Sequence, residues 1–578
     1  MRFLRVKMDE LRVVAEEVPE QYRKLAGRGL TSRLVFDEVP PTAHPLGPKA
    51  KLFIAPGAVA GTAAPSSGRV SVGGKSPLTW GIKEANAGTP VAQSLARLGI
   101  KAIIVEGEPM DGRYWMLKVT KDGTELMPAG DLVGKGLYEA YAALKERFPT
   151  AGFIACGPGA ERRLATAGVC FNDTEGRPSR YSGRGGLGAV MAAKGLKFIV
   201  VDGAGTQPVA PLDEELFHKG IAKLREAILT HGVTKPGGTL NSYGTAALIN
   251  ALNEAGGLPT RNFSSGRFEG AARVSGEHMA DVIHERGGHG TTGHACHPGC
   301  IIKCSNIYPR PDGTELVSCV EYESDWALGP NCGIDDLDAI AEMIWHCNDL
   351  GIDTIEMGVT IGVAMEAGLL KFGDAKGALA LFDEIRKGTA LGHILGQGAA
   401  FTGRAFGVIR VPTVKGQGMP AYEPRAVKGV GTTYITSPMG ADHTAGYAVA
   451  PEILSVGGKA DPLSAEGKAD LSKAFQDTTA WLDMSGYCLF IAFPILDIAS
   501  GFEGAVESVN AVLGTDFKVS DVASFGGQIV GWEREFNRRA GMTAAHNRPP
   551  EFMRYEKLPP HNTVYDVPDE ELDRIAGV

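Results

Sequence analysis

The chain of 578 residues is 44% hydrophobic and 22% charged, and its formal net charge is −9. Its length exceeds what one hydrophobic core usually supports, so we expect two to four domains. The acidic balance argues against non-specific binding to nucleic acid, and there is no apolar run of about 18 or more residues that would span a membrane.

Residues 1–208 are predicted to be rich in β-strands. Short β-branched runs that end at glycine or at turn residues indicate strands over residues 51–57, 69–74, 101–107 and 196–203. Residues 1–14 alternate charged and apolar side chains as a strand does, and the Asp-Gly step at 122–123 is typical of a hairpin turn. Helical patterns are few in this part, and we expect them over residues 89–98 and 136–148.

Residues 209–408 are predicted to be mainly helical, because apolar residues recur there at helical spacing. The segments concerned are 213–231, 336–350 and 374–386. From residue 409 the chain passes through glycine- and proline-rich loops, and helices are expected again near 471–482 and 502–513. The last twenty residues are rich in proline and acids, and we expect them to wrap the surface.

The segment His294–Cys304 reads HACHPGCIIKC and contains three thiols at steps of four residues: Cys296, Cys300 and Cys304. Pro298 and Gly299 interrupt the first step, so we predict a turn that leads into a short helix. Three thiolates from one turn suit a soft metal centre, and an iron–sulfur cluster held by cysteine needs a fourth ligand. Cys488, in DMSGYCLF, is the candidate that we favour.

A zinc site is the alternative, with the same cysteines and His294 or His297 as ligands. Structural zinc usually shows a second ligand pair downstream, and the sequence has no second C-x-x-C or H-x-x-x-H pair. The nine cysteines are an odd number and lack the spacing of a disulfide framework. They favour a reducing compartment, and the N-terminus lacks the apolar core of a signal peptide, so we expect a cytoplasmic protein.

Three glycine-containing segments in the first part place bare backbone beside a charged or polar side chain. They contain Arg69, then Asn86 and Gly88, then Arg184, Gly185 and Gly186. The third segment, RYSGRGGLG, precedes a helix and resembles a phosphate cradle, since arginine and the N–H groups of a helix start both favour anions. It is not the dinucleotide fingerprint G-x-G-x-x-G. A tight turn is the simpler interpretation of each segment.

Two distant segments repeat one pattern: an amide or acid, two further residues, glycine, a bulky residue, then an acid or thiol. They are Asn348–Thr354, which reads NDLGIDT, and Asp483–Leu489, which reads DMSGYCL. Each could be a helix end capped by glycine. They could also be two similar arms that grip a roughly symmetric ligand, and Cys488 in the second arm would connect that ligand to the cysteine cluster.

Motifs of this kind occur in order along nearly the whole chain. They include APSSGRV, ANAG, GRGGLGAVMAAK, EYESDWALGPNCGIDDL, LGIDT, PAYEPR and LDMSGYCLF. In this set the sequence resembles the tungsten-containing aldehyde ferredoxin oxidoreductase family. The resemblance implies an α+β fold: a β-rich N-terminal base domain (1–208) binds the cofactor, and two mainly helical domains (209–408 and 409–578) cover it.

The resemblance also implies the cofactors. They are tungsten, or molybdenum, held by two pyranopterins, a magnesium ion that joins the pterin phosphates, and a 4Fe–4S cluster. Asn86 and Gly185 fall where backbone carbonyls surround the magnesium, and Arg69 falls where an arginine spans pterin and cluster. The residues that match pterin contacts are Arg69, Asn86, Gly88, Arg184, Gly185, Gly186, Asn348, Asp353, Thr354, Asp483 and Leu489. The implied cluster ligands are Cys296, Cys300, Cys304 and Cys488.

Four further matches imply the catalytic groups. Glu323 and His443 match the family's acid–base pair, and Tyr322 and Tyr422 match its pocket tyrosines. The implied reaction is oxidation of an aldehyde to a carboxylic acid, with electrons passed through the cluster to ferredoxin or a ferredoxin-like subunit. Low-potential reduction of a carboxylic acid or an aryl-CoA ester is the alternative within the family, and a zinc-stabilised protein without redox chemistry is the alternative outside it. An oligomer is expected.

The sequence departs from the family pattern at four places. The first cysteine step is longer than usual, so His297 occupies the usual first position and Cys296 lies one residue earlier. Asn348 replaces an aspartate, and Ala445 stands where relatives can carry lysine. The subunit-bridging metal motif E-x-x-H is offset at Glu342, because the histidine lies four residues on, and this weakens the case for that metal.

Overall fold

Two six-stranded sheets build the N-terminal part of the computed structural model, which describes residues 1–577. The first has the order β2-β1-β6-β3-β4-β5, with β1 Arg2–Lys7, β2 Arg12–Glu17, β3 Leu52–Pro56, β4 Arg69–Lys75, β5 Ile82–Gly88 and β6 Ile100–Glu106. The second has the order β11-β10-β9-β12-β7-β8, with β7 Trp115–Thr120, β8 Gly123–Pro128, β9 Gly152–Cys156, β10 Val169–Phe171, β11 Arg180–Ser182 and β12 Leu196–Val201. The helices of this part are α1 Gly27–Glu38, α2 Pro90–Arg97, α3 Leu137–Arg147, α4 Pro158–Glu161 and α5 Leu187–Ala193.

The strands and helices predicted for this part are confirmed, except that residues 1–14 form no single strand: β1 and the start of β2 form an antiparallel hairpin there. The β7–β8 hairpin turns at the Asp-Gly step, where Thr120 pairs with Gly123. Helix α2 begins after Thr89, whose side chain accepts a hydrogen bond from the N–H of Val91. Strand β5 was not predicted, because its sequence IKEANAG has no β-branched run. Its polar residues Glu84 and Asn86 line a cavity.

The rest of the chain is mainly helical, with two small sheets. The helices are α6 Glu214–Thr230, α7 Thr239–Tyr243, α8 Leu248–Glu254, α9 Gly276–Arg286, α10 Tyr322–Leu328, α11 Leu337–Leu350, α12 Thr354–Glu366, α13 Ala375–Lys387, α14 Ala390–Gly396, α15 Ala399–Phe406, α16 Lys428–Thr436, α17 Lys468–Ser485, α18 Ala492–Asp497, α19 Ala499–Leu513, α20 Val522–Arg539, α21 Phe552–Tyr555 and α22 Asp569–Ala576. The strands are β13 Thr291–His294, β14 Ser305–Pro309, β15 Glu315–Ser318, β16 Thr413–Val414 and β17 Gln417–Gly418. The predicted helices correspond to α6, α11, α13, α17 and α19. The fold is therefore α+β, as expected.

Two local predictions were wrong. The cysteine segment has no short helix: it runs between β13 and β14 as turns and bends, and Gly299 and Lys303 have φ values of 85° and 52° that a right-handed helix cannot contain. The last twenty residues are not confined to the surface. Tyr565 and Val567 are fully buried, and α22 packs against α16 and α17.

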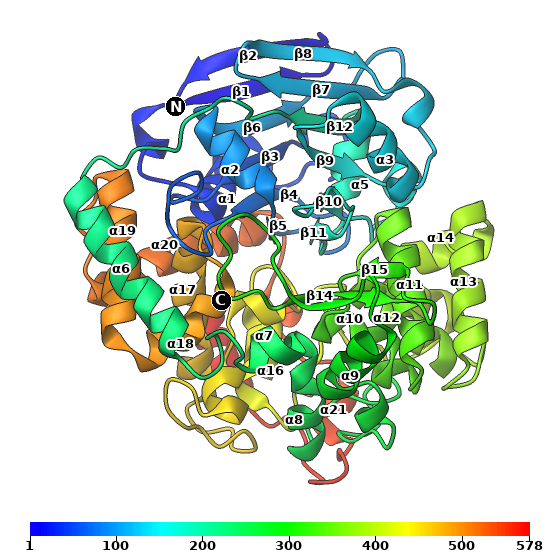
Figure 1. Cartoon of the computed structure of the whole chain (residues 1–578). Helices are drawn as coiled ribbons and strands as arrows, with labels where there is room; N and C mark the ends of the chain where they lie inside the picture. Colours follow the sequence, from blue (N-terminus) through cyan, green and yellow to red (C-terminus); the bar gives the residue numbers. More distant parts are fainter. Residues whose placement is uncertain (578) are drawn as a thin grey trace.

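The first sheet is packed on both faces, and alternate residues of a strand point to different cores. In β3, Leu52 and Ile54 belong to the core between the two sheets, whereas Phe53 and Ala55 belong to the core shared with the helices. The sheets therefore lie above the helical parts, as Figure 1 shows. Helix α6 lies beside α19, so the first helix after the sheets joins the C-terminal helical group (Figure 1).

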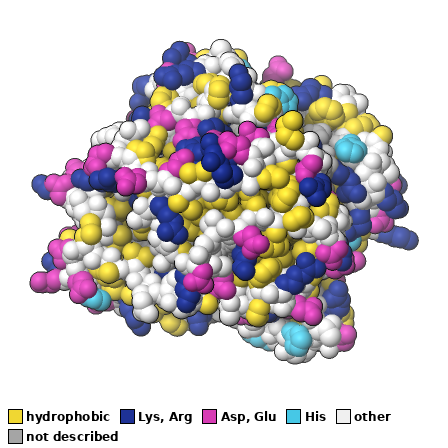
Figure 2. Space-filling view, turned by 90° about the horizontal axis from the view of Figure 1, so that it is seen from above, with side chains coloured by type: hydrophobic (Ala, Val, Ile, Leu, Met, Phe, Trp, Pro, Cys, Tyr) yellow, Lys and Arg dark blue, Asp and Glu magenta, His cyan; other side chains and the backbone are white. Residues whose placement is uncertain are grey.

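On the face seen from above, basic and acidic side chains are intermingled, and hydrophobic side chains gather near its middle (Figure 2). Among the helices of residues 1–577, none is both long enough and apolar enough to cross a membrane.

The sheets and the C-terminal helices meet at a backbone-to-backbone contact. A Cβ atom built on Gly57, which follows β3, would lie 2.0 Å from the Cα atom of Gly486, which follows α17. The N–H groups of Ala58 and Val59 donate to the carbonyls of Met484 and Ser485 at 3.1 Å and 2.9 Å. Glycine is required here because no side chain fits between the two segments.

We predict that Gly57→Ala destabilises the fold, because the added methyl group collides with backbone that cannot rotate away. Overpacking of this kind costs about 1–3 kcal/mol. Thermal unfolding measures the effect, and Gly232→Ala is the matched control, since a Cβ on Gly232 meets nothing within 4 Å. Equal melting temperatures for the two variants would contradict the importance of this contact.

Candidate functional site

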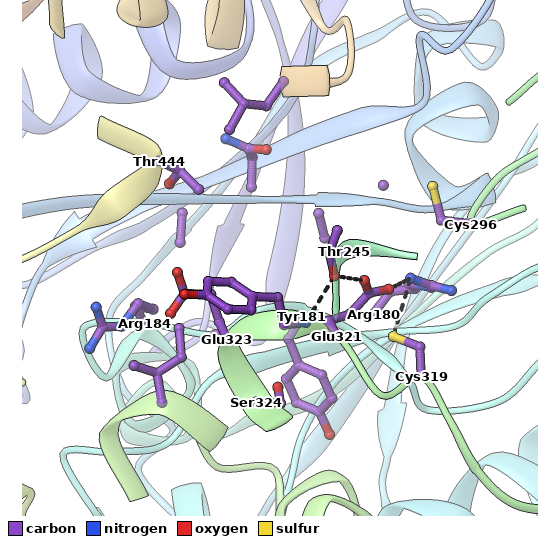
Figure 3. Close-up of a pocket in the computed structure, with 18 of the residues that line it drawn as sticks. Arg180, Tyr181, Arg184, Thr245, Cys296, Cys319, Glu321, Glu323, Ser324 and Thr444 are labelled. Carbon is purple, nitrogen blue, oxygen red and sulfur yellow. Dashed lines mark hydrogen bonds and ion pairs between the residues drawn. The ribbon is translucent and has the colours of Figure 1, made fainter. Parts of the chain in front are cut away.

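A cavity of about 360 Å³ lies where the first sheet meets the helical parts. Most residues singled out from the sequence line it: Arg69, Asn86, Gly88, Arg184, Cys296, Cys300, Cys304, Tyr322, Glu323, Asn348, Asp353, Thr354, Tyr422, His443, Asp483, Cys488 and Leu489. Gly185 and Gly186 do not line it. Residues more than 400 positions apart in the sequence therefore share one cavity, and Figure 3 shows part of its wall.

Four thiols gather at one end of the cavity. The Sγ atoms of Cys296 and Cys300 lie within 4.8 Å of each other, with a ring nitrogen of His297 equally close. Cys304 and Cys488 line the same cavity, and the guanidinium of Arg69 donates to Cys488 Sγ at 3.5 Å. His297 has another contact, because its Nε2 accepts a hydrogen bond from the N–H of Gly68 at 3.3 Å.

Ser66 joins the two chain segments that carry these thiols. Its carbonyl accepts from the N–H of Cys488 at 2.8 Å, and its Oγ accepts from the N–H of Ile301 at 3.3 Å. Its own N–H donates to the carbonyl of Gly299 at 2.9 Å. These hydrogen bonds therefore hold the segment that carries the fourth thiol beside the segment that carries the other three.

The two repeated segments are both glycine-capped helix ends, and both line the cavity. Gly351 follows α11 with φ 72°, and Gly486 follows α17 with φ 88°. Each segment then reaches the start of another helix, where Asp353 and Cys488 are the N-cap residues. The sequence left two interpretations open: glycine-capped helix ends, or two arms that grip one ligand. They are compatible, because a glycine cap turns each helix end towards the same cavity.

Buried arginines hold the polar side chains of the two arms. Arg184 donates through Nε to Asp353 at 3.0 Å, and Arg28 donates through Nη1 to Asp483 at 3.1 Å. Asn86 of β5 also donates to Asp483, at 3.2 Å. The polar residues of β5 thus face a polar cavity, which explains why this strand lacks the usual apolar pattern.

Close packing explains the glycines of the first part. A Cβ on Gly88 would lie 2.9 Å from the Sγ of Cys296, so only glycine lets β5 approach the thiols. Gly185 and Gly186 have φ values of 84° and 79°, and a Cβ on them would collide with Lys83 and with the carbonyl of Ala165. The tight-turn interpretation therefore accounts for Gly185 and Gly186.

The four expected catalytic residues lie together at the other end of the cavity. The Nε2 atom of His443 lies 3.6 Å from Oε1 of Glu323, which has no hydrogen-bond partner within the described chain. The other carboxylate oxygen of Glu323 accepts from the N–H of Ala421 at 2.9 Å. Tyr322 donates to the carbonyl of Ala421 at 2.6 Å, and the hydroxyls of Tyr422 and Tyr447 are 2.7 Å apart.

Burial suppresses the charge of both acid–base groups. It raises the pKa of Glu323 to about 8 and lowers the pKa of His443 to about 4. The Nδ1 atom of His443 has no hydrogen-bond partner among residues 1–577. At neutral pH the pair is therefore a protonated acid beside a neutral imidazole, with open hydrogen-bonding positions on both.

Sequence reasoning missed a polar group next to the thiols. Arg180 donates to Ser305 Oγ at 2.8 Å. Figure 3 shows its contact with Cys319 Sγ, at 3.5 Å, and the hydrogen bond that Thr245 donates to Glu321 at 2.6 Å. Cys319 is thus a fifth thiol in the cavity wall. Its isolation in the sequence gave no signal, whereas Arg180 stands in the RYSGRGG segment from which only the second arginine was chosen.

Comparisons with known proteins agree with this geometry. The family model "Aldehyde ferredoxin oxidoreductase, N-terminal domain" matches residues 3–203, and the model for domains 2 and 3 of the same family matches residues 219–575. The tungsten-containing aldehyde ferredoxin oxidoreductase of Pyrococcus furiosus is 35% identical over 94% of this chain and 90% of its own length. The enzyme of that name from Thermococcus kodakarensis is 36% identical over 94% of this chain and 89% of its own length.

Two further proteins are similar at lower identity. The WOR-like subunit of an aliphatic sulfonate oxidoreductase of Pyrococcus furiosus is 24% identical over 89% of this chain and 82% of its own length. The active-site complex BamBC of benzoyl coenzyme A reductase, solved with 1,5-dienoyl-CoA, has a TM-score of 0.78 at 18% identity over 99% of this chain and 92% of that one, which shows the fold alone. Fold, cavity and relatives place the chain in the class of oxidoreductases. More closely, it belongs to the aldehyde ferredoxin oxidoreductase family.

We predict a pH-dependent gain of stability for Glu323→Gln. Because the pKa of Glu323 is raised from 4.5 to about 8, the carboxyl group stabilises the fold below about pH 4.5, and this contribution is lost as the pH rises to about 8. Glutamine does not ionise, so the melting temperature of the variant should rise relative to the wild type between these values, with a limit of about 1.4 kcal/mol per pH unit. Thermal unfolding across this range tests it, and parallel curves would refute it.

Proposed function

We propose that this enzyme oxidises aldehydes to carboxylic acids at a tungsten bis-pyranopterin centre between the two arms. Its electrons would leave through a 4Fe–4S cluster to ferredoxin or a ferredoxin-like subunit. The observation that carries the proposal is the single cavity that joins four thiols to an acid–base pair. The names of the relatives at 35% and 36% identity support the substrate and the acceptor.

The thiol end fits an iron–sulfur cluster in its donor chemistry. The hydrogen bond to Cys300, together with burial, raises the pKa of the Cys296 thiol, and burial raises the pKa of the Cys304 thiol. Cys296 and Cys304 would therefore stay protonated unless a cation lies among the thiols, whereas the hydrogen bond to Cys296 lowers the pKa of Cys300 to about 7. Cys296, Cys300, Cys304 and Cys488 would hold the cluster, and Arg69 would lie between the cluster and the pterins.

The middle of the cavity fits a polar cofactor with two similar halves. Asn348, Asp353 and Thr354 line it from the first arm, and Asp483 and Leu489 line it from the second. Magnesium near Asn86 and Gly185 remains part of the proposal. The expected ligands are backbone carbonyls: Asn86 lines the cavity, whereas Gly185 does not, and the carbonyl of Gly185 already accepts from Ser76 at 2.7 Å, which leaves it one further lone pair.

The reaction adds one oxygen from water to the aldehyde and releases two electrons and two protons. When bound, tungsten and its pterins supply the two-electron acceptor, and the cluster supplies the one-electron outlet. Glu323 in its ionised form takes the proton of the attacking water on its open Oε1 atom. His443, kept neutral by burial, donates a hydrogen bond to the carbonyl oxygen of the aldehyde.

The remaining expectations keep their place in the proposal. Reduction of a carboxylic acid or an aryl-CoA ester would use the same side chains in the opposite direction, and assays in both directions separate the two activities.

A zinc-stabilised protein would contain zinc without iron, sulfide or tungsten, so metal analysis of the purified protein tests it directly. All nine cysteines are free, which supports the proposal of a cytoplasmic protein. An oligomer also remains part of the proposal.

We predict that Glu323→Gln loses catalysis but keeps metal and cluster. General acid–base groups contribute about 10²- to 10⁴-fold to a rate, and kcat/KM for an aldehyde with a viologen dye should fall by that order. In the wild type, kcat/KM should rise towards about pH 8, since burial raises the pKa of Glu323 to about 8 and only the ionised form accepts a proton. The exposed Glu226 of α6 provides the control, Glu226→Gln. Unchanged turnover in the first variant would remove Glu323 from the mechanism.

We also predict that Cys488→Ser loses the cluster, since three thiols and a hydroxyl bind iron less well than four thiols. Iron and acid-labile sulfide per chain, with the visible absorbance, measure the loss. Cys319→Ser is the matched control, because this fifth thiol lines the same cavity but is not one of the proposed ligands. Loss of iron in the control with retention in Cys488→Ser would reverse the assignment.

A further inference from the structure

A second pocket, of about 560 Å³, opens beside the loop that follows β4, on the far side of the Gly185–Gly186 turn from the cavity. It shares no lining residue with the cavity described above. We propose that this pocket binds a small anion that carries a flat ring. This site is additional to the proposed aldehyde oxidation and does not depend on it.

Uncompensated positive charge is the first reason. Arg163, Arg404 and Lys415 line the pocket, and no aspartate or glutamate does. None of the three cations forms a salt bridge within the described chain. Arg163 donates to the hydroxyl of Tyr114 at 2.9 Å, and Lys415 donates to the carbonyl of Ile435 at 2.8 Å, so their hydrogen-bond acceptors are neutral.

This charge is unusual for the protein. The chain as a whole has a net charge of −9, and the face in Figure 2 mixes both signs. Burial lowers the pKa of Lys415 to about 7, so an anion beside this amine would favour its charged form. A phosphate or carboxylate is the group that such a cluster of cations recognises, since arginine forms charge-assisted hydrogen bonds with either.

Exposed aromatic surface is the second reason. Trp80 and Phe401 line the pocket, yet 52% of the first and 43% of the second remain exposed. Trp80 is held in place: His44 packs edge-on against its ring at 5.1 Å, and the ammonium group of Lys75 lies 5.9 Å from the ring centre. Proteins bind flat rings by stacking them on such aromatic surfaces next to cations.

A turn of two residues connects this pocket to the candidate active site. Lys415 and Gly416, with φ values of 52° and 84°, form the turn between β16 and β17 and line the pocket. The residues directly after the turn contact the cavity wall. Gln417 donates to the carbonyl of Ala441 at 2.5 Å, and the carbonyl of Gly418 accepts from Arg184 at 2.7 Å. An occupant of the pocket would therefore touch the hairpin that also supports Arg184.

Isothermal titration calorimetry of the holoenzyme tests the proposal with four probes. AMP and benzoate each carry a ring and a negative charge, adenosine carries a ring alone, and inorganic phosphate carries charge alone. We expect saturable binding of AMP or benzoate, and the one that binds identifies the anion as a phosphate or a carboxylate. Adenosine and phosphate should bind at least about tenfold more weakly, because each lacks one of the two recognised groups.

Variants locate the binding. Arg404→Glu should weaken binding of the active probe by at least about tenfold, since one charge-assisted contact becomes repulsive. Arg225→Glu, at an exposed position of α6, makes the same change of charge elsewhere and should bind as the wild type does. If Arg404→Glu does not fold, Phe401→Ala replaces it and removes stacking surface instead. Absence of saturable binding for both AMP and benzoate, or equal affinity in the pocket and control variants, would overturn the proposal.

Discussion

The cavity depends on buried ion pairs between the sheet part and the helices. Arg28, on α1, is 2% exposed and pairs with Glu533 of α20 at 2.8 Å as well as with Asp483 of the second arm. Arg184 forms the corresponding ion pairs at the first arm, with Asp353 of the arm and with Glu356 of α12. A buried charge without a partner is strongly unfavourable, so each arginine holds an arm at a fixed distance from the N-terminal part of the chain. These pairs position the polar walls of the cavity.

Within these walls, two chemically different environments lie close together. At one end, thiols surround a point towards which Arg69 extends, and at the other an acid and an imidazole are both kept neutral by burial. Thiols at one end and an acid–base pair at the other would suit coupled electron and proton transfer, as proposed above. The membership of the aldehyde ferredoxin oxidoreductase family gives this arrangement its most direct interpretation.

The β16–β17 hairpin, which accepts a hydrogen bond from Arg184 of the cavity wall, also lines the second pocket. Its turn is short and both of its residues have positive φ, so its shape is fixed by backbone conformation. Both sites are lined by arginines and aromatic side chains, but only the cavity also contains acids and thiols. The pocket lacks acidic side chains, so it would bind a different kind of ligand from the cavity.

The sequence by itself determined the α+β class, several of the strands and helices, and the family, because these follow from local periodicity and from motifs in a fixed order. It also indicated Cys488, Glu323 and His443, whose motifs are distinctive. Only the tertiary structure brought these residues into one cavity, added Cys319 and Arg180, and excluded a helix from the cysteine segment. It explained Gly185 and Gly186 by packing against Lys83 and Ala165. The physical reason is that hydrogen-bonding patterns within an element are local in sequence, whereas burial, unpaired charge and contact between segments hundreds of residues apart exist only after the chain has folded.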